Sequence, residues 1–310
     1  MAIGPGRSAG IRVAPLPTGT RPAPGPDLLA GLRRQAPDFP PMSRQKPAPT
    51  ILLFDSGLGG LTVYREVAQA RPDARFIYAA DDALFPYGSV EEGRLVARVI
   101  KLIGDLIDAH NPDLVVIACN TASTIALPAL RARFTVPFVG TVPAIKPACA
   151  ASLTRRVSVL GTEATVRREY TRALIREFAA GCDVTLVGAQ HLAALAEARL
   201  DGKAVDDAAI AVEIAPCFVE HGGARTDTVV LACTHFPLLL DDLTRLAPWP
   251  VAFIDPAPAI ARRVVELMGP AERRDPTPPR VVLSSGRPLS PALRRALAGA
   301  HQVETWASRV

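Results

Sequence analysis

Two cysteines stand in matching sequence surroundings and offer the clearest potential for chemistry in this chain. Cys119 and Cys233 each follow a run of branched apolar residues ending in alanine, and each precedes small polar residues, within segments 114–123 and 229–237. A thiolate is a base and a nucleophile, and a helix N-terminus or a nearby cation favours its formation. The repetition suggests chemistry done on one substrate from two sides.

Three further side chains are candidates to assist the thiols. His235 lies two residues after Cys233, where it can tune that thiol or protonate a leaving group. Asp55 ends the first apolar run, where a carboxylate orients or deprotonates its neighbours or caps a helix. Glu197 lies within a helical pattern, for which a solvated helical face is the default interpretation. The remaining cysteines are interpreted as small buried residues: Cys149, Cys182 and Cys217.

The loop 56–60, Ser-Gly-Leu-Gly-Gly, is similar to an anion cradle at a helix N-terminus. It has neither the glycine order of a dinucleotide site nor the lysine of a phosphate-binding loop. A bound nucleotide is therefore not expected.

The apolar runs predict the elements that position these residues. Runs bounded by polar residues are typical of buried parallel strands, whose carboxyl ends face ligands. From residue 50 the order strand, loop, helix recurs, with helices over 61–70, 121–132, 166–178 and 206–221 among others. The pattern predicts an α/β fold of two similar three-layer domains with mainly parallel sheets and an active site in the cleft between them. We expect residues 50–142 and 255–310 to form the first domain and residues 143–254 the second.

Residues 1–49 differ from the rest of the chain in composition. They hold 11 of the 30 prolines and the entire excess of positive charge, so a disordered extension is expected, or a true start at Met42. The remainder is neutral and gives no reason to expect nucleic acid binding. No apolar run approaches the roughly 20 residues of a membrane span, and five cysteines without disulfide spacing fit a reducing compartment. We expect a soluble cytoplasmic protein without membrane contact, and a homodimer is left open.

Five segments together resemble glutamate racemase, of the aspartate/glutamate racemase superfamily. The resemblance spans about residues 50 to 285 and rests on segments 54–60, 85–88, 119–123, 142–148 and 233–239. Two positions depart from the family pattern. Ala232 replaces a usual glycine before the second cysteine, and Asp82 stands where asparagine, threonine or serine is more usual.

The resemblance implies cofactor-independent racemisation of L- and D-glutamate, supplying D-glutamate for peptidoglycan. It implies that Cys119 and Cys233 are the catalytic acid/base pair, with Cys233 acting on L-glutamate and Cys119 on D-glutamate. The implied substrate-binding residues are Asp55, Ser56, Tyr87, Gly88, Asn120, Thr121, Thr234 and His235, with Thr165 as a weaker candidate. The implied auxiliary groups near the thiols are Asp55, Glu197 and His235.

No cofactor and no metal are expected. Lys146 is the one lysine considered for a Schiff base with pyridoxal phosphate, and it lies in a structural segment of the family. Without that electron sink, the site must stabilise a carbanion by hydrogen-bond donors and by excluding water.

Other functions remain open on the sequence alone. An aspartate or hydantoin racemase shares the two-thiol plan, although segments 85–88 and 55–60 favour glutamate. A non-catalytic amino-acid-binding protein would explain a cleft but not the repeated thiols. A thiol redox protein is disfavoured, because cysteines on opposite sides of a substrate cannot reach the roughly 3.5–4.5 Å Cβ separation of a disulfide.

Overall fold

The first of two parallel sheets gathers strands from both ends of the described chain. The computed structural model describes residues 47–272, 277–297 and 303–305, and these described residues belong to one compact unit. The sheet has the order β12-β11-β2-β1-β3-β4. Its strands are β12 (Val303–Thr305), β11 (Arg280–Leu283), β2 (Arg75–Ala80), β1 (Thr50–Asp55), β3 (Leu114–Ile117) and β4 (Phe138–Gly140). Every residue of β1 is buried, as a central parallel strand requires.

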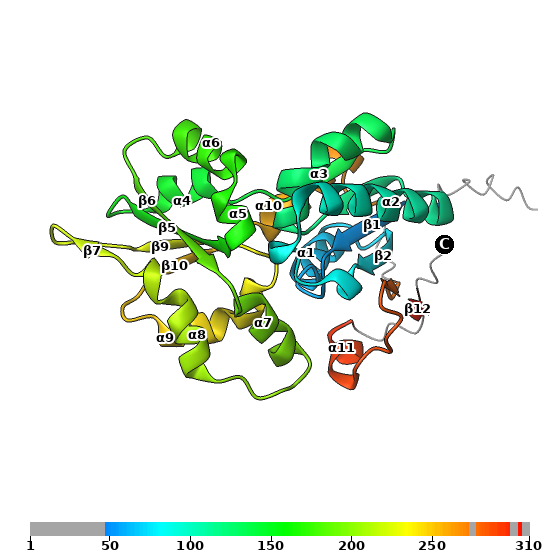
Figure 1. The fold of residues 1–310 in the computed structure, drawn as a ribbon. Coiled ribbons are helices and arrows are strands. Elements are labelled where there is room, and N and C mark those ends of the chain that lie inside the picture. The colour runs from blue at the N-terminus through cyan, green and yellow to red at the C-terminus, as the bar shows by residue number, and fades with distance from the viewer. Residues whose placement is uncertain (1–46, 273–276, 298–302, 306–310) are drawn as a thin grey trace, which may run out of the picture. The chain divides into compact units, whose positions relative to one another are not determined.

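Helices cover both faces of this sheet (Figure 1). One apolar cluster joins the sheet to α1 (Leu61–Ala70), α10 (Ala257–Met268) and α11 (Pro291–Ala296). The other joins it to α2 (Glu92–His110) and α3 (Asn120–Arg133). Along α2, Leu95, Val99, Leu102 and Leu106 form the buried stripe that their spacing predicts.

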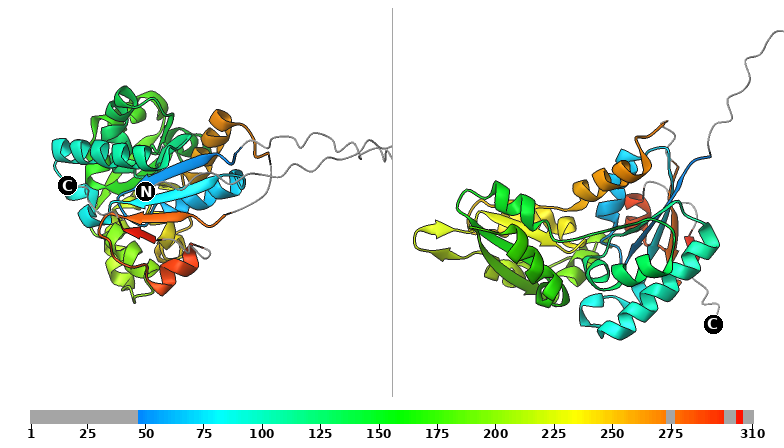
Figure 2. Two further views of the ribbon diagram at one scale, coloured as in Figure 1. Left: turned by 90° about the vertical axis from the view of Figure 1, so that its right-hand side faces the viewer. Right: turned by 90° about the horizontal axis from the view of Figure 1, so that it is seen from above.

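The second sheet is built from the middle of the chain and has the order β10-β9-β5-β6. Its strands are β10 (Ala252–Ile254), β9 (Thr228–Ala232), β5 (Arg156–Thr162) and β6 (Asp183–Ala189). One face packs against α4 (Ile145–Ala151) and α6 (Glu169–Phe178), the other against α7 (Leu192–Leu200), α8 (Asp207–Ile214) and α9 (Leu240–Leu246). Figure 2 shows the two sheets beside each other in its right-hand view.

The two sheets share one topology. In the first, the order β2-β1-β3-β4 places the reversal of strand order between β1 and β3; in the second, β6-β5-β9-β10 places it between β5 and β9. Such a reversal opens a crevice at the carboxyl ends of the strands. The expected α/β class with mainly parallel sheets is confirmed by these strands and their parallel pairing. The expected domain boundaries stay a prediction.

Several expected elements differ from the observed ones. The helix expected over 166–178 is two helices, α5 (Glu163–Arg167) and α6, separated by Arg168 in an extended conformation. The helix expected over 206–221 ends at Ile214, because a 3₁₀ turn with Pro216 follows.

The short elements of the chain complete the fold. A hairpin of β7 (Glu220–His221) and β8 (Ala224–Arg225) was not expected, and neither was β12. Four 3₁₀ turns are η1 (Asp82–Leu84), η2 (Tyr87–Ser89), η3 (Ala215–Cys217) and η4 (Phe236–Leu239). The disorder expected for residues 1–49 falls almost entirely outside the described residues. Within the described ranges, no helix combines the length and apolar composition that a membrane crossing needs.

Candidate active site

A narrow cavity of about 20 Å³ lies at the carboxyl ends of both sheets. This volume is about that of one water molecule, so the walls of the cavity lie close together. The lining residues come from both halves of the fold: Ser56, Phe85, Pro86, Tyr87, Gly88, Cys119, Asn120, Thr121, Thr162, Ala193, Cys233, Thr234 and His235. Both cysteines therefore face one cavity, each from the strand that borders the reversal of strand order in its sheet.

Cys119 is the N-cap residue of α3 and is buried. Its thiol donates a hydrogen bond to Ser56 Oγ over 3.6 Å, and Ala122 N donates to its Sγ over 3.4 Å. Burial, together with the negative charge of Asp55, raises the pKa of Cys119 to about 12. The expectation that the helix N-terminus would favour thiolate is wrong for this residue, because burial outweighs the helix dipole.

Cys233 has a different environment. It follows β9 directly, and the next element is the 3₁₀ turn η4, so the α-helix expected from about Pro237 begins only at Leu240. Its Sγ lies 3.8 Å from His235 Nδ1. Burial opposes a charge on His235, but its contacts with Cys233 and Glu197 outweigh burial and raise the pKa of His235 to about 10. A protonated imidazole places a positive charge beside the sulfur of Cys233.

Glu197 supports His235 from α7. Its Oε1 lies 3.1 Å from His235 Nε2 and accepts a 2.7 Å hydrogen bond from Leu58 N. Burial would raise the pKa of Glu197, but these contacts and the charge of His235 hold it below its usual value. Its side chain is 15% exposed, so the default interpretation of a solvated carboxylate is wrong.

Asp55 is fully buried and does not line the cavity. Its Oδ2 accepts hydrogen bonds from Gly60 N at 2.8 Å and Gly57 N at 3.4 Å, and its Oδ1 accepts from Thr234 Oγ1 at 3.3 Å. Burial raises the pKa of Asp55, while the positive charge of His235 opposes that rise. Asp55 thus ties the loop of the first half to the residue that follows Cys233.

The loop 56–60 is not an open anion cradle. Besides the N–H groups that bond Asp55 and Glu197, Gly59 N points at His235 Nε2 over 3.2 Å. The N–H groups of Gly57, Leu58, Gly59 and Gly60 therefore all serve side chains of the protein itself.

Asn120 and three threonines lie at or directly behind the wall of the same cavity. Asn120 is buried, and both polar atoms of its side chain have no hydrogen-bond partner among the described residues. Thr121, Thr162 and Thr165 join through their hydroxyl groups at 3.0–3.2 Å. Thr165 stands behind the cavity wall, and Thr162 lines it. Sequence reasoning missed Thr162, although the repeated topology places the end of β5 opposite the end of β1.

The segment 85–88 forms another part of the wall. Tyr87 Oη donates to Asp81 Oδ2 over 2.7 Å, and Arg98 binds both oxygens of the same carboxylate from α2. Asp81 and Arg98 were not singled out from the sequence. The sequence offered one signal for Asp81. It is an acidic residue at the end of β2, much as Asp55 is at the end of β1.

Among the described residues, neither a metal-binding cluster nor a lysine lies at the cavity. Within the described ranges, no group of three or more His, Cys, Asp or Glu side chains is arranged to hold a metal ion. Lys146 lies on α4 with its Nζ 5.4 Å from the ring centre of Phe178, and it does not line the cavity. Cys149 and Cys217 are buried within the apolar clusters of the second half, and Cys182 packs at the edge of one of them.

Comparison with known proteins agrees with this geometry. Residues 58–264 match the family described as Asp/Glu/Hydantoin racemase. A glutamate racemase of Brucella ovis is 56% identical over 238 residues, which cover 76% of this chain and 86% of that protein. A glutamate racemase of Brucella anthropi is 58% identical over 221 residues, covering 71% and 80%.

A solved structure extends the similarity to the fold. The crystal structure of Escherichia coli glutamate racemase in complex with L-glutamate and the activator UDP-MurNAc-ala is 39% identical, with a TM-score of 0.76, over 84% of this chain and 98% of that one. The chain therefore belongs to the Asp/Glu/hydantoin racemase family and is an isomerase that acts on a small molecule. The expectation of a racemase is confirmed.

Proposed function

We propose that this protein interconverts L- and D-glutamate without a cofactor, by two-base proton transfer between Cys119 and Cys233. One observation carries the proposal: two thiols lie at equivalent strand ends of two sheets that share a four-strand order, and both line one cavity. Inversion at a carbon atom needs proton removal from one face and proton delivery to the other. A pair of groups on opposite sides of the substrate meets that need.

The environments of the two thiols support a direction for each proton. In the L-to-D direction, the Cys233 thiolate takes the α-proton and becomes a thiol. The electron pair of the broken C–H bond stays on the α-carbon until the Cys119 thiol delivers its proton to the opposite face. Cys119, with a pKa of about 12, starts as the acid, and protonated His235 balances the thiolate of Cys233. The D-to-L direction reverses these steps.

The carbanion needs stabilisation, since an α-proton of an amino acid is a far weaker acid than a thiol. The free amide of Asn120 and the hydroxyl groups of Thr121 and Thr234 are suited to bind the α-carboxylate, where negative charge develops. The low exposure of these side chains keeps water away from the reacting carbon. Ser56, Tyr87, Gly88 and His235 complete the proposed substrate-binding set. Asp55 acts on this set indirectly, through Thr234 and the loop after β1.

Glutamate is the proposed substrate because two relatives at 56% and 58% identity are glutamate racemases, and the E. coli structure holds L-glutamate. Supply of D-glutamate for peptidoglycan follows as the proposed cellular role. Growth of a D-glutamate-requiring bacterium expressing this chain, without added D-glutamate, tests the role. A panel of L-glutamate, L-aspartate and hydantoins separates the proposal from the related racemases.

The mechanism is tested with protiated L-glutamate in D₂O, sampled before much conversion. With two bases, Cys233 keeps the substrate proton and Cys119 delivers a solvent-derived one. Nearly all early D-glutamate then carries deuterium at the α-carbon, while recovered L-glutamate stays protiated. Substantial protium in early product would mean that one base serves both faces, and the mechanism would fail.

Cys119→Ala and Cys233→Ala test the residues themselves. Each variant loses the proton carrier of one face, so racemisation should fall below detection while the far-ultraviolet circular dichroism spectrum is retained. Cys182→Ala is the matched control, since this thiol lies outside the cavity, and it should stay active. Racemisation by either variant would show that the substituted cysteine is not a member of the acid/base pair.

A further inference from the structure

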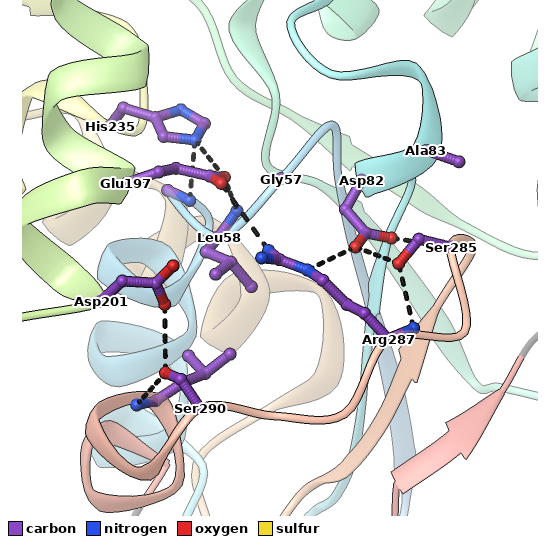
Figure 3. A network of polar contacts seen from close by, with 12 residues as sticks. Gly57, Leu58, Asp82, Ala83, Glu197, Asp201, His235, Ser285, Arg287 and Ser290 are labelled. Atoms are coloured by element: carbon purple, nitrogen blue, oxygen red, sulfur yellow. Dashed lines mark hydrogen bonds and ion pairs between the residues drawn. The ribbon is translucent and has the colours of Figure 1, made fainter.

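A segment that follows the first sheet reaches across to a helix of the second half. Residues 284–290 come directly after β11, and two of them contact α7 or its C-terminal residue (Figure 3). Arg287 Nη2 lies 3.8 Å from Glu197 Oε2, and Ser290 Oγ donates to Asp201 Oδ1 over 3.0 Å. Glu197 and Asp201 are one helical turn apart, so the segment binds one face of the helix.

Asp82 fixes Arg287 on the side of the first sheet. Its carboxylate is only 3% exposed and accepts a 2.8 Å hydrogen bond from Arg287 Nε. The same carboxylate accepts from Ser285 N at 2.9 Å and from Ser285 Oγ, and this hydroxyl oxygen also accepts from Arg287 N at 3.1 Å. Asp82 therefore fixes the guanidinium group at Nε, and Nη2 points toward Glu197 (Figure 3).

The two oxygens of Glu197 have separate partners. Oε1 serves the site, where it meets His235 Nε2 and Leu58 N. Oε2 faces Arg287. A carboxylate held from both sides cannot rotate its Oε1 away from His235 without losing the charge contact with Arg287.

We propose that Arg287, anchored by Asp82, is a positioning residue for the racemisation reaction. It orients Glu197, and Glu197 in turn holds His235 protonated beside Cys233. The proposal rests on the proposed function. It also gives a role to Asp82, which departs from the residue usual at its position, since a neutral side chain there would not hold the guanidinium by charge.

The kinetic test compares Arg287→Gln, Glu197→Gln and the double variant in racemisation of L-glutamate. Arg287→Gln should lower kcat about threefold to tenfold, with a smaller change in KM. The double variant should be no slower than Glu197→Gln alone, because Arg287 acts only through Glu197. Arg287→Lys should recover part of the loss. Multiplied losses in the double variant would overturn the proposal, and so would an unchanged kcat in Arg287→Gln.

A spectroscopic test separates this inference from the proposed function. The Glu197 carboxyl is titrated by ¹³C NMR, with Glu197→Gln used to assign the signal. Loss of the positive charge in Arg287→Gln should raise the pKa of Glu197 and leave carboxyl groups that do not contact Arg287 unchanged. This titration can be measured whether or not the protein racemises glutamate. An unchanged Glu197 titration would refute the positioning role.

Arg263→Gln is the matched control. Arg263 lies on α10 and pairs with Glu266 on the exposed surface. The substitution removes the same charge and should leave both kcat and the Glu197 titration unchanged. Asp82→Asn should reproduce the direction of the Arg287→Gln effects, since it releases the anchor of the guanidinium.

Discussion

The two thiols of the cavity differ in the charge around them. Cys119 lies near the carboxylate of Asp55 in a fully buried setting, which keeps its proton in place. Cys233 lies beside His235, whose pKa is raised to about 10. These different surroundings support the proposed roles in the L-to-D direction, with Cys119 as the acid and Cys233 as the base. L- and D-glutamate have equal free energies, so kcat/KM must be equal in the two directions. The difference between the two thiols can therefore change kcat and KM between the two directions, but not their ratio.

The charge on His235 predicts a pH dependence. A group with a raised pKa is protonated below that pKa and loses its charge above it. Activity that needs the imidazolium should therefore hold through neutral pH and fall as pH rises through about 10. His235→Asn should lower kcat/KM about 100-fold at pH 8 and abolish this basic limb. Initial rates from pH 6.5 to 10.5 give the measurement.

The exposed residue His191 gives the control for that substitution. His191→Asn should keep the wild-type rate and pH profile. A basic limb near pH 10 that survived in His235→Asn would assign the titration to another group.

Asn120 predicts opposite effects on activity and stability. An unpaired buried amide costs about 1–3 kcal/mol, so Asn120→Ala should make the ligand-free protein at least as stable as wild type while severely lowering activity. Ser123 lies one turn later on α3, and its Oγ donates to Ile117 O and accepts from Thr141 N. Ser123→Ala should cost about 1–3 kcal/mol. Urea unfolding and racemisation rates test both, and a clear loss of stability in Asn120→Ala would contradict the argument.

The loop between β1 and α1 is the element that brings the two halves into contact. Its glycines leave room for side chains from the other half. A Cβ atom on Gly57 would lie 2.3 Å from Glu197 Oε1, and one on Gly59 would lie 2.4 Å from His235 Nδ1. Glycine at these positions is thus a condition for the hydrogen bond from Leu58 N to Glu197 and for the close approach of the loop to His235.

Gly59→Ala is expected to displace His235, because the new methyl group would occupy the position of the ring. Racemisation should fall at least about tenfold, while the sheets and their cores remain folded. Gly93→Ala is the control. Gly93 lies in the first turn of α2, and its new Cβ would meet only the flexible carboxylate of Glu91 at 3.3 Å. Circular dichroism and initial rates report both variants, and a fully active Gly59→Ala would show that the ring tolerates the shift.

Helices and strands were predicted correctly from the sequence where a local signal marks them. The apolar stripe of α2 and the unbroken apolar strands β1 and β3 identify themselves by periodicity and length. The break between α5 and α6 at Arg168 has no such signal, because no glycine or proline marks it. Pro216 did mark the end of the helix that begins at Asp207, and the apolar pattern through residue 219 obscured it.

From the residue pattern alone, the two cysteines were the clearest site residues, because a strand end and a repeated motif coincide there. The family resemblance added Tyr87, Gly88 and Glu197. Glu197 reaches the site through tertiary packing of α7, and Arg287 through a segment that follows β11. Arg287 and Glu197 are 90 residues apart in sequence, and no local pattern encodes their contact. The helix-dipole argument for Cys119 failed because burial, which a sequence does not quantify, is the larger effect.

For the whole molecule, the site depends on two sheets that repeat one topology and share one compact unit. That unit begins at Pro47, and its first strand, β1, is the centre of the first sheet. β1 pairs with β2 through residues 50–55 and with β3 through residues 51–54, and its last residue is Asp55. Every residue placed in the proposed site follows it in the chain.

Two truncations test this dependence. Deletion of residues 1–41, which begins the chain at Met42, should leave the melting temperature and the racemisation rate at wild-type values, because β1 and all of its pairing partners remain. Deletion of residues 1–54 removes all of β1 except Asp55 and takes four fully buried apolar side chains, Ile51 to Phe54, from the two clusters that flank the sheet. The longer deletion should abolish cooperative unfolding, since β2 and β3 lose the strand that joins them. Differential scanning calorimetry and rates with L-glutamate measure both proteins. A large loss of stability or turnover in the shorter deletion would show that residues 1–41 contribute to the folded unit.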